Sequence, residues 1–202
     1  MNFTHFSEKL HSTIGAKEFG TLHKNLVEEY NKIEPLPRNY KVSLNDPWCA
    51  IYVSAMWHKW CDGWFPYECS CSKMIEAAKA ANMFWYSAAT NGHAGWLIFY
   101  DWERDGLPDH VGYIIEVDKY TGQTRVIEGN YSNQIKERYI PLGDRRIYGF
   151  IKLQYEDSEI DRAKEWATKN RIILGDGTAD SWTKPVTREQ LAVILARYHQ
   201  AT

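Results

Sequence analysis

One cysteine of this sequence occupies a position at which its thiol should be ionised. Asp46 suits the N-cap of a helix, and Pro47 suits the first helical position, where a proline loses no hydrogen bond. Cys49 follows in the first turn of a helix that we expect to run to about Trp60. The unpaired backbone N–H groups and the dipole at a helix start lower the pKa of a thiol there. We therefore predict that Cys49 is a nucleophile, the alternative being a small buried apolar residue.

The other three cysteines lack such a position. Cys61 falls near the end of the same expected helix, whereas Cys69 and Cys71 fall in an irregular Cys-Ser-Cys link. A zinc site formed by these three and His58 is an alternative, although the sequence offers no paired Cys-x-x-Cys unit. Positions 1–15 contain no apolar stretch of signal-peptide length, which predicts synthesis in the reducing cytoplasm. At least some of the thiols should therefore be free.

A nucleophilic thiol needs a base, and His110 is the best-placed histidine. It opens a run of β-branched and aromatic residues that is typical of a strand, and a strand end holds a side chain rigidly. His93, which falls in a loop, is the alternative. We predict that His110 is the general base for Cys49.

A third polar group should orient the imidazole of His110. The strand that follows ends with Glu128 and Asn130, which are two residues apart and so share one face. We expect Asn130 to face His110 across the hairpin, and the helix that carries Cys49 to pack on this same face of the sheet.

The register of this hairpin can be predicted from its loop. If Val117 faces Gln123, then Gly112 faces Glu128. A glycine at position 112 would leave room for the side chain of Glu128.

Helices are expected early in the chain and strands later. Apolar residues recur at helical spacing between Phe6 and Ile33, which predicts one or two helices, and a short Ala-rich helix should end near Ala81. Turn-forming residues at 118–122 predict a hairpin loop. This order indicates an α+β domain. The strands are expected at residues 96–100, 111–117, 124–128 and 146–153.

Length and charge limit the classes of protein. The 202 residues suffice for one domain and a small appendage, and we predict units at 1–155 and 156–202. The second should be a helix–loop–helix unit, with helices at 159–169 and 187–198. The net charge of −2 argues against a nucleic-acid partner, and no segment is apolar enough to span a membrane.

Four segments of the chain, taken together, carry a resemblance to a known family. They are residues 46–54 with Cys49, 108–113 with His110, 127–130 with Glu128 and Asn130, and 147–150. Their order and spacing resemble those of the CHAP family, the cysteine- and histidine-dependent amidohydrolases and peptidases among the papain-like and NlpC-type hydrolases. The resemblance spans roughly residues 14–155. It implies a papain-like fold, with N-terminal helices packed on an antiparallel sheet.

The resemblance also implies an activity, which is cleavage of an amide bond in bacterial peptidoglycan. Cys49 would attack the amide and His110 would transfer the proton, while Glu128 and Asn130 would complete the polar set. The bond would be either that between N-acetylmuramic acid and L-alanine or one within the peptides. Residues 36–42 resemble phage endolysins, which implies synthesis in the cytoplasm and action on the wall after release.

Further expectations concern ligands. Among the aromatic residues, Trp48 and Trp96 are candidates to contact the substrate. We expect no cofactor and no metal, because residues 41–47 supply too few oxygen ligands for the calcium that some members of the family bind. The alternative function is that of a non-catalytic wall-binding protein with an inactive hydrolase domain.

The C-terminal segment resembles a single S-layer-homology motif at residues 166–167, 175–177 and 185–192. This resemblance implies binding of secondary cell-wall polysaccharide, with Arg188 pairing with an anionic sugar substituent. Such motifs usually come in threes, and this chain has one. The alternative is a helical pair that packs or forms a homo-oligomer.

Overall fold

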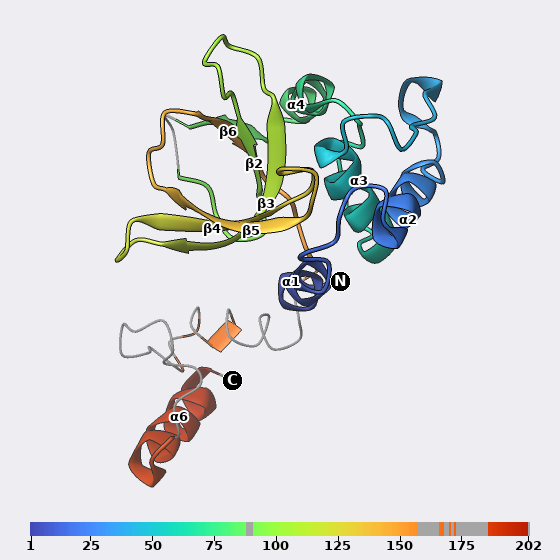
Figure 1. Cartoon of the computed structure of the whole chain (residues 1–202). Helices are drawn as coiled ribbons and strands as arrows, with labels where there is room; N and C mark the ends of the chain where they lie inside the picture. Colours follow the sequence, from blue (N-terminus) through green and yellow to red (C-terminus); the bar gives the residue numbers. More distant parts are fainter. Residues whose placement is uncertain (88–90, 157–165, 168–169, 171, 173–185, 202) are drawn as a thin grey trace. The chain divides into compact units, whose positions relative to one another are not determined.

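The computed structural model of the chain describes residues 1–87, 91–156, 166–167, 170, 172 and 186–201 (Figure 1). The chain divides into two compact units, Met1–Glu156 and Asp157–Thr202. Five α-helices and a six-stranded antiparallel sheet are present in the described part, which confirms the predicted α+β class. No helix of that part is long and apolar enough to cross a membrane.

The first two helices form where helical spacing predicts them. Helix α1 spans Phe3–His11, and the side chain of Asn2 caps it by accepting the His5 N–H at 3.0 Å. Helix α2 spans Thr21–Tyr30. Both bury their apolar faces in the main core, which also receives the later helices α3 (Cys49–Trp60) and α4 (Cys71–Ala80).

Helix α3 begins later than its sequence predicts. Trp48 is the residue before the helix, and Cys49 is its first residue. The carboxylate of Asp46 instead closes a preceding turn, where it accepts the backbone N–H of Ser43 at 2.6 Å and the hydroxyl of Tyr40 at 2.8 Å. The prediction that Asp46 is the N-cap is therefore wrong, and the correction places Cys49 at the very start of the helix.

The sheet has the strand order β1-β6-β2-β3-β4-β5. The four predicted strands are confirmed with small shifts of their ends, and the hairpin loop lies between β3 and β4 as predicted. Two strands, β1 and β5, had no predicted counterpart. The strands are β1 Phe84–Tyr86, β2 Leu97–Tyr100, β3 His110–Asp118, β4 Gln123–Glu128, β5 Lys136–Pro141 and β6 Ile147–Ile151.

The predicted register of the β3–β4 hairpin is wrong by one residue near the loop but correct at Gly112. Asp118 pairs with Gln123, one residue away from the predicted pairing. A bulge at Ile115 then inserts one residue into β3 and removes the offset, so that Gly112 faces Glu128 as predicted.

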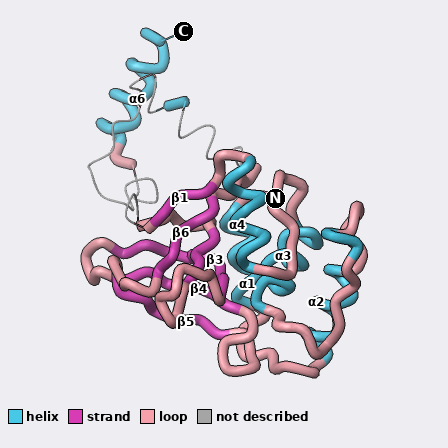
Figure 2. Tube along the Cα trace, turned by 90° about the horizontal axis from the view of Figure 1, so that it is seen from above, coloured by secondary structure: helices cyan, strands magenta, loops and turns pink. Residues whose placement is uncertain are grey.

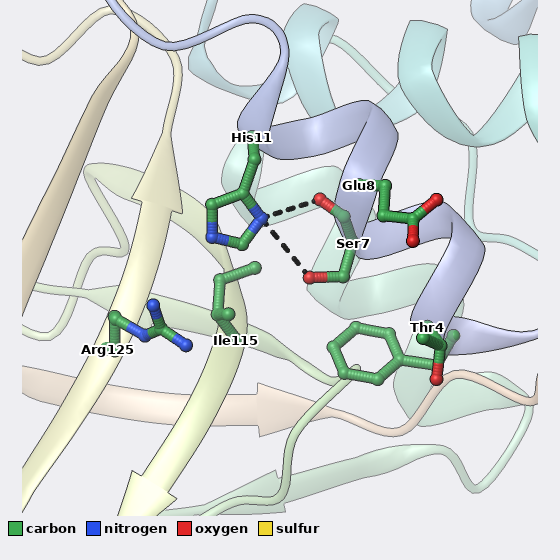
Figure 3. A pocket seen from close by; sticks show the side chains of 7 residues that line it. Thr4, Ser7, Glu8, His11, Ile115 and Arg125 are labelled. Carbon is green, nitrogen blue, oxygen red and sulfur yellow. Dashed lines mark hydrogen bonds between the residues drawn. The ribbon is translucent and has the colours of Figure 1, made fainter.

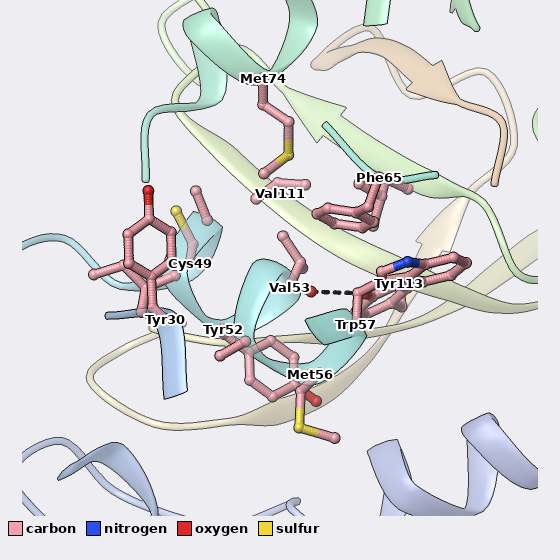
Figure 4. Close-up of a cluster of buried hydrophobic side chains, with 14 of the residues drawn as sticks. Tyr30, Cys49, Tyr52, Val53, Met56, Trp57, Phe65, Met74, Val111 and Tyr113 are labelled. Atoms are coloured by element: carbon pink, nitrogen blue, oxygen red, sulfur yellow. Dashed lines mark hydrogen bonds between the residues drawn. The ribbon is translucent and has the colours of Figure 1, made fainter. Parts of the chain in front are cut away.

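Helices gather against one face of the sheet (Figure 2). Side chains alternate along a strand, and Val111 and Tyr113 of β3 pack into the main core with α3 (Figure 4). The Tyr113 hydroxyl donates to the Val53 carbonyl of α3 at 2.7 Å, which ties the helix to the strand. A smaller apolar cluster, which includes Tyr100 and Ile114, lies on the opposite face.

The C-terminal unit is described mainly by helix α6, Arg188–Ala201, which confirms the second helix predicted there. Thr187 and Gln190 form a reciprocal cap: the Thr187 N–H donates to Gln190 Oε1 at 2.9 Å, and the Gln190 N–H to Thr187 Oγ1 at 3.1 Å. Most of the first predicted helix, 159–169, and the motif segment 175–177 lie outside the described residues.

Candidate active site

The nucleophile candidate lies where two helices begin. Cys49 is the first residue of α3, and Cys71 is the first residue of α4. Their sulfur atoms are 3.9 Å apart, and the two residues are 6% and 7% exposed. All four cysteines of the chain are free thiols. The expectation that Cys49 alone occupies a helix start is wrong, since Cys71 shares this feature.

The pKa of the Cys49 thiol is held well below its ordinary range. The hydrogen bond from Cys71 is the largest cause, and hydrogen bonding and charge from His110 add to it. The backbone N–H of Ala50 also bonds to the sulfur, as expected at a helix start. Burial acts in the opposite direction but does not prevail. The surroundings of the sulfur therefore favour its thiolate form.

His110 is the first residue of β3 and is buried. Burial lowers the pKa of its imidazole, but the interactions with Cys49 and with the Glu128 carboxylate outweigh burial and raise the pKa to about 9. Its Nε2 lies 3.7 Å from Glu128 Oε2. Since Nε2 faces Glu128, we assign the other ring nitrogen, Nδ1, to the sulfur of Cys49. Because its pKa is raised to about 9, the imidazole is protonated at neutral pH.

Glu128, the last residue of β4, stabilises the positive charge of His110. Its side chain is fully buried, and burial opposes its ionisation, but His110 and Arg138 lower its pKa below the ordinary value. Arg138 Nη1 of β5 donates to Glu128 Oε2 at 2.8 Å. A Cβ atom at Gly112 would lie only 2.5 Å from Glu128 Cγ, so only glycine fits beside this carboxylate.

Four charges of alternating sign thus run through the site, from Cys49 through His110 and Glu128 to Arg138. Cys49, His110 and Glu128 are buried and Arg138 is half-buried, and each charge is stabilised by the next, as buried charges require. Such a row supplies a nucleophilic thiolate together with an acid that can protonate a leaving group. This is the chemistry of acyl transfer.

Aromatic rings surround the imidazole of His110. The ring centroids of Tyr100, Trp102 and Tyr131 lie 6.0, 5.9 and 6.1 Å from that of His110. The Arg138 guanidinium lies 3.9 Å above the Tyr131 ring. These rings limit both the movement of the imidazole and the access of water to it.

The face on which the site forms differs from the prediction. His110 and Glu128 share the sheet face of Tyr100, because Tyr100 pairs with His110 and side chains alternate. Helix α3 packs on the other face. Cys49 meets His110 because each is the first residue of its element, so the two can approach at the end of the sheet.

Asn130 is not opposite His110. The β3–β4 pairing ends at Gly112 and Glu128, and Asn130 follows in a left-handed conformation with φ of 59°. Its side chain makes no hydrogen bond to any described residue. The prediction that Asn130 faces His110 across the ladder is therefore wrong, and the aromatic ring next to His110 from this loop is that of Tyr131.

The two tryptophans predicted to contact the substrate do not join the site. Trp48 is 1% exposed and donates to Glu18 at 3.1 Å, so its ring is closed to a substrate. Trp96 precedes β2 at the end away from Tyr100, about 13 Å along the strand. Arg188 begins α6 in the other unit and is exposed.

Sequence reasoning missed two members of the site, Cys71 and Arg138. The signal for Cys71 was present, since Ser70 is a suitable cap ahead of an Ala-rich helix. Arg138 gave no such signal, because β5 is an edge strand with charged residues on both faces and no apolar alternation.

The alternative residues for catalysis or metal binding lie elsewhere. His93 is exposed and packs against the Trp96 ring at 4.7 Å. His58 bonds to Glu29 at 2.8 Å, whereas Cys69 accepts from Arg38 at 3.2 Å. Within the described residues, no three His, Cys, Asp or Glu side chains form a group that could hold a metal ion.

A separate cleft of about 500 Å³ lies between α1 and the strands β3 and β4 (Figure 3). It is lined by His11, Ile115 and Arg125, among others. Ile115 is about 16 Å along β3 from His110, so this cleft is distinct from the site. Arg125 is paired with Glu116 at 3.1 Å, and we assign the cleft no function.

Comparison of the chain with known protein families, with curated proteins and with solved structures finds no match.

Proposed function

We propose that the protein is a cysteine amidohydrolase or peptidase that cleaves an amide bond of bacterial peptidoglycan. The observation that carries this proposal is the placement of Cys49 at the start of α3 and His110 at the start of β3, with Glu128 and Arg138 next to the imidazole. The directions of the Cys49 and His110 pKa shifts favour a thiolate–imidazolium pair. The resemblance of the surrounding segments to the CHAP family supports the substrate class. A papain-like arrangement, in which the nucleophile begins a helix and the histidine begins a strand, is compatible with the α+β fold.

The direction of the two pKa shifts specifies the roles of Cys49 and His110. The proton resides on His110 before substrate binds, so the thiolate attacks the carbonyl carbon directly and the C–S bond forms. His110 then donates its proton to the leaving amine as the C–N bond breaks. His110 thus acts as the acid of the first step, with the proton that it has taken from Cys49 as its general base.

Hydrolysis of the thioester completes the cycle. His110, now neutral, takes a proton from water, whose oxygen attacks the acyl carbon and releases the Cys49 thiolate. The backbone N–H of Cys49, at the start of α3, is suited to stabilise the oxyanion in both steps. We assign no step to Asn130.

The experiment that tests this function uses purified peptidoglycan and mass spectrometry of the released fragments. The native chain should release fragments with new amino termini, and those termini identify the bond as the muramoyl-L-alanine amide or a peptide bond. Cys49→Ala should release none, whereas Cys69→Ser should match the native chain. Fragment release by Cys49→Ala would contradict the proposal. Wall binding without fragment release by the native chain would favour a non-catalytic wall-binding protein.

For the C-terminal unit we propose binding of secondary cell-wall polysaccharide by the exposed Arg188. Sedimentation of the protein with intact walls tests this role, and Arg188→Ala should reduce the sedimenting fraction. Equal sedimentation of both forms, with self-association on analytical ultracentrifugation, would instead favour oligomer formation.

A further inference from the structure

Two thiols in contact are an unusual feature of this site. The sulfur atoms of Cys49 and Cys71 are 3.9 Å apart, with each residue at the start of its own helix. Both belong to one apolar cluster and are nearly closed to solvent. A mechanism of acyl transfer needs only the first of these sulfurs.

The other two cysteines are differently placed. Cys69 accepts a hydrogen bond from Arg38 Nη2 at 3.2 Å. Burial raises the pKa of Cys61 to about 12, so its thiol is unreactive near neutral pH. Of the other three thiols, Cys71 is therefore the one in contact with Cys49.

We propose that Cys49 and Cys71 are a redox modification site, at which a peroxide converts the two thiols to a reversible disulfide. The Cys49 thiolate attacks one peroxide oxygen: an S–O bond forms, the O–O bond breaks, and hydroxide leaves. The Cys71 sulfur then attacks the Cys49 sulfenic acid: the S–S bond forms, the S–O bond breaks, and the hydroxyl leaves with the Cys71 proton as water. The two sulfurs lose two electrons, which the peroxide gains.

The local electrostatics suit this order of events. The hydrogen bond with Cys49 is the largest cause that raises the pKa of Cys71 well above its ordinary value, followed by burial. Oxidation of Cys49 removes its negative charge and so removes the first cause, which makes Cys71 easier to ionise when it must attack. The two sulfurs must then approach from 3.9 Å to about 2.05 Å.

The disulfide has two consequences. It blocks the nucleophile until a thiol reductant restores it, a consequence that rests on the proposed function. It also stops oxidation at a reversible level, because a sulfenic acid without a nearby thiol proceeds to sulfinic and sulfonic acids.

The experiment treats the full chain with excess hydrogen peroxide and maps the cysteine peptides by mass spectrometry before and after dithiothreitol. The native chain should give a cross-linked peptide that contains Cys49 and Cys71, and dithiothreitol should restore alkylation of Cys49. In Cys71→Ser, which keeps a hydrogen-bond donor but forms no disulfide, Cys49 should become irreversibly oxidised. Cys69→Ser is the matched control and should behave as the native chain.

Sulfinic acid at Cys49 of the native chain, or a cross-link to Cys61 or Cys69, would overturn the inference. The cross-link is read in the native chain itself, so the result does not depend on how well a variant folds. Formation of the Cys49–Cys71 cross-link in a protein that fails to cleave peptidoglycan would support this inference while contradicting the proposed function.

Discussion

At the scale of single residues, the site depends on which group holds one proton. The pKa of His110 is raised to about 9, above its ordinary 6.5, so the imidazolium stabilises the folded state fully below pH 6.5 and this contribution is lost as the pH rises through 9. The Cys49 pKa is lowered, so the thiolate is lost only as the pH falls through that lowered value. The ion pair therefore exists between the two limits.

Replacement of Glu128 by glutamine should lower the upper pH limit of the Cys49–His110 ion pair. Removal of a carboxylate that stabilises the imidazolium should lower the pKa of His110 by about 1 to 3. The upper limit of the pH profile for fragment release should therefore move from near pH 9 toward neutrality. A profile of kcat/KM against pH measures the change. An upper limit that stays in place in Glu128→Gln would show that Glu128 does not act through His110.

Replacement of Cys71 should raise the pKa of Cys49, because Cys71 is the largest cause that lowers it. Cys71→Ala removes the donor, so as the pH is lowered the rate of Cys49 alkylation by iodoacetamide should begin to fall at a higher pH than in the native chain, because the thiolate is the reactive form. Cys71→Ser keeps a donor and should lose less. Equal rates in all three proteins would mean that Cys71 does not stabilise the thiolate.

At the scale of elements, the sequence was most informative where apolar spacing and turn residues act together. The order of helices and strands and the hairpin loop were predictable. The start of α3 was not, because Asp46 found hydrogen-bond donors in its own turn. The bulge at Ile115 was also unpredictable, since it leaves no mark in the residue pattern.

The site itself was predictable only in part. Cys49, His110 and Glu128 could be named because each has a local signal at the end of its element. The contribution of Arg138 could not, because it depends on β5, whose charged residues resemble a loop. The sheet face of His110 depends on how α3 packs, which is a tertiary property that local patterns do not encode.

Substitution of Gly112 by alanine tests the close contact between Gly112 of β3 and Glu128 of β4. The new Cβ would meet Glu128 Cγ at 2.5 Å, and overpacking of this kind costs about 1–3 kcal/mol of unfolding free energy. Fragment release should fall because Glu128 must move. Gly122→Ala is the control: with φ of 68° it strains the distant hairpin loop but meets nothing within 4 Å. It should lose stability in urea unfolding while keeping activity, and similar losses of activity in both variants would contradict this account.

At the scale of the whole molecule, chemistry and wall attachment are assigned to different units. Every member of the site lies within Met1–Glu156, which is compact by itself. The amino terminus even pairs with Glu156 at 2.8 Å, so a cut after this residue keeps the contact. The two functions should therefore be separable.

A chain that ends at Glu156 should keep its catalytic rate on soluble peptidoglycan fragments. Its activity on intact walls at low protein concentration should fall, because the wall attachment proposed for the second unit would raise the effective concentration of the protein at the wall. Initial rates on the two substrates measure the difference. Loss of activity on soluble fragments would show that the second unit contributes to the site.

The most direct test of the central claim is to trap the acyl-enzyme. A soluble peptidoglycan fragment is mixed with the protein, the reaction is stopped with acid within the first turnover, and the mass of the intact chain and of its peptides is measured. The expected result is an acyl adduct on the peptide that contains Cys49, absent when Cys49 is alanine. Turnover of the fragment with no adduct at Cys49, or an adduct on another residue, would contradict the assignment of this sulfur as the nucleophile.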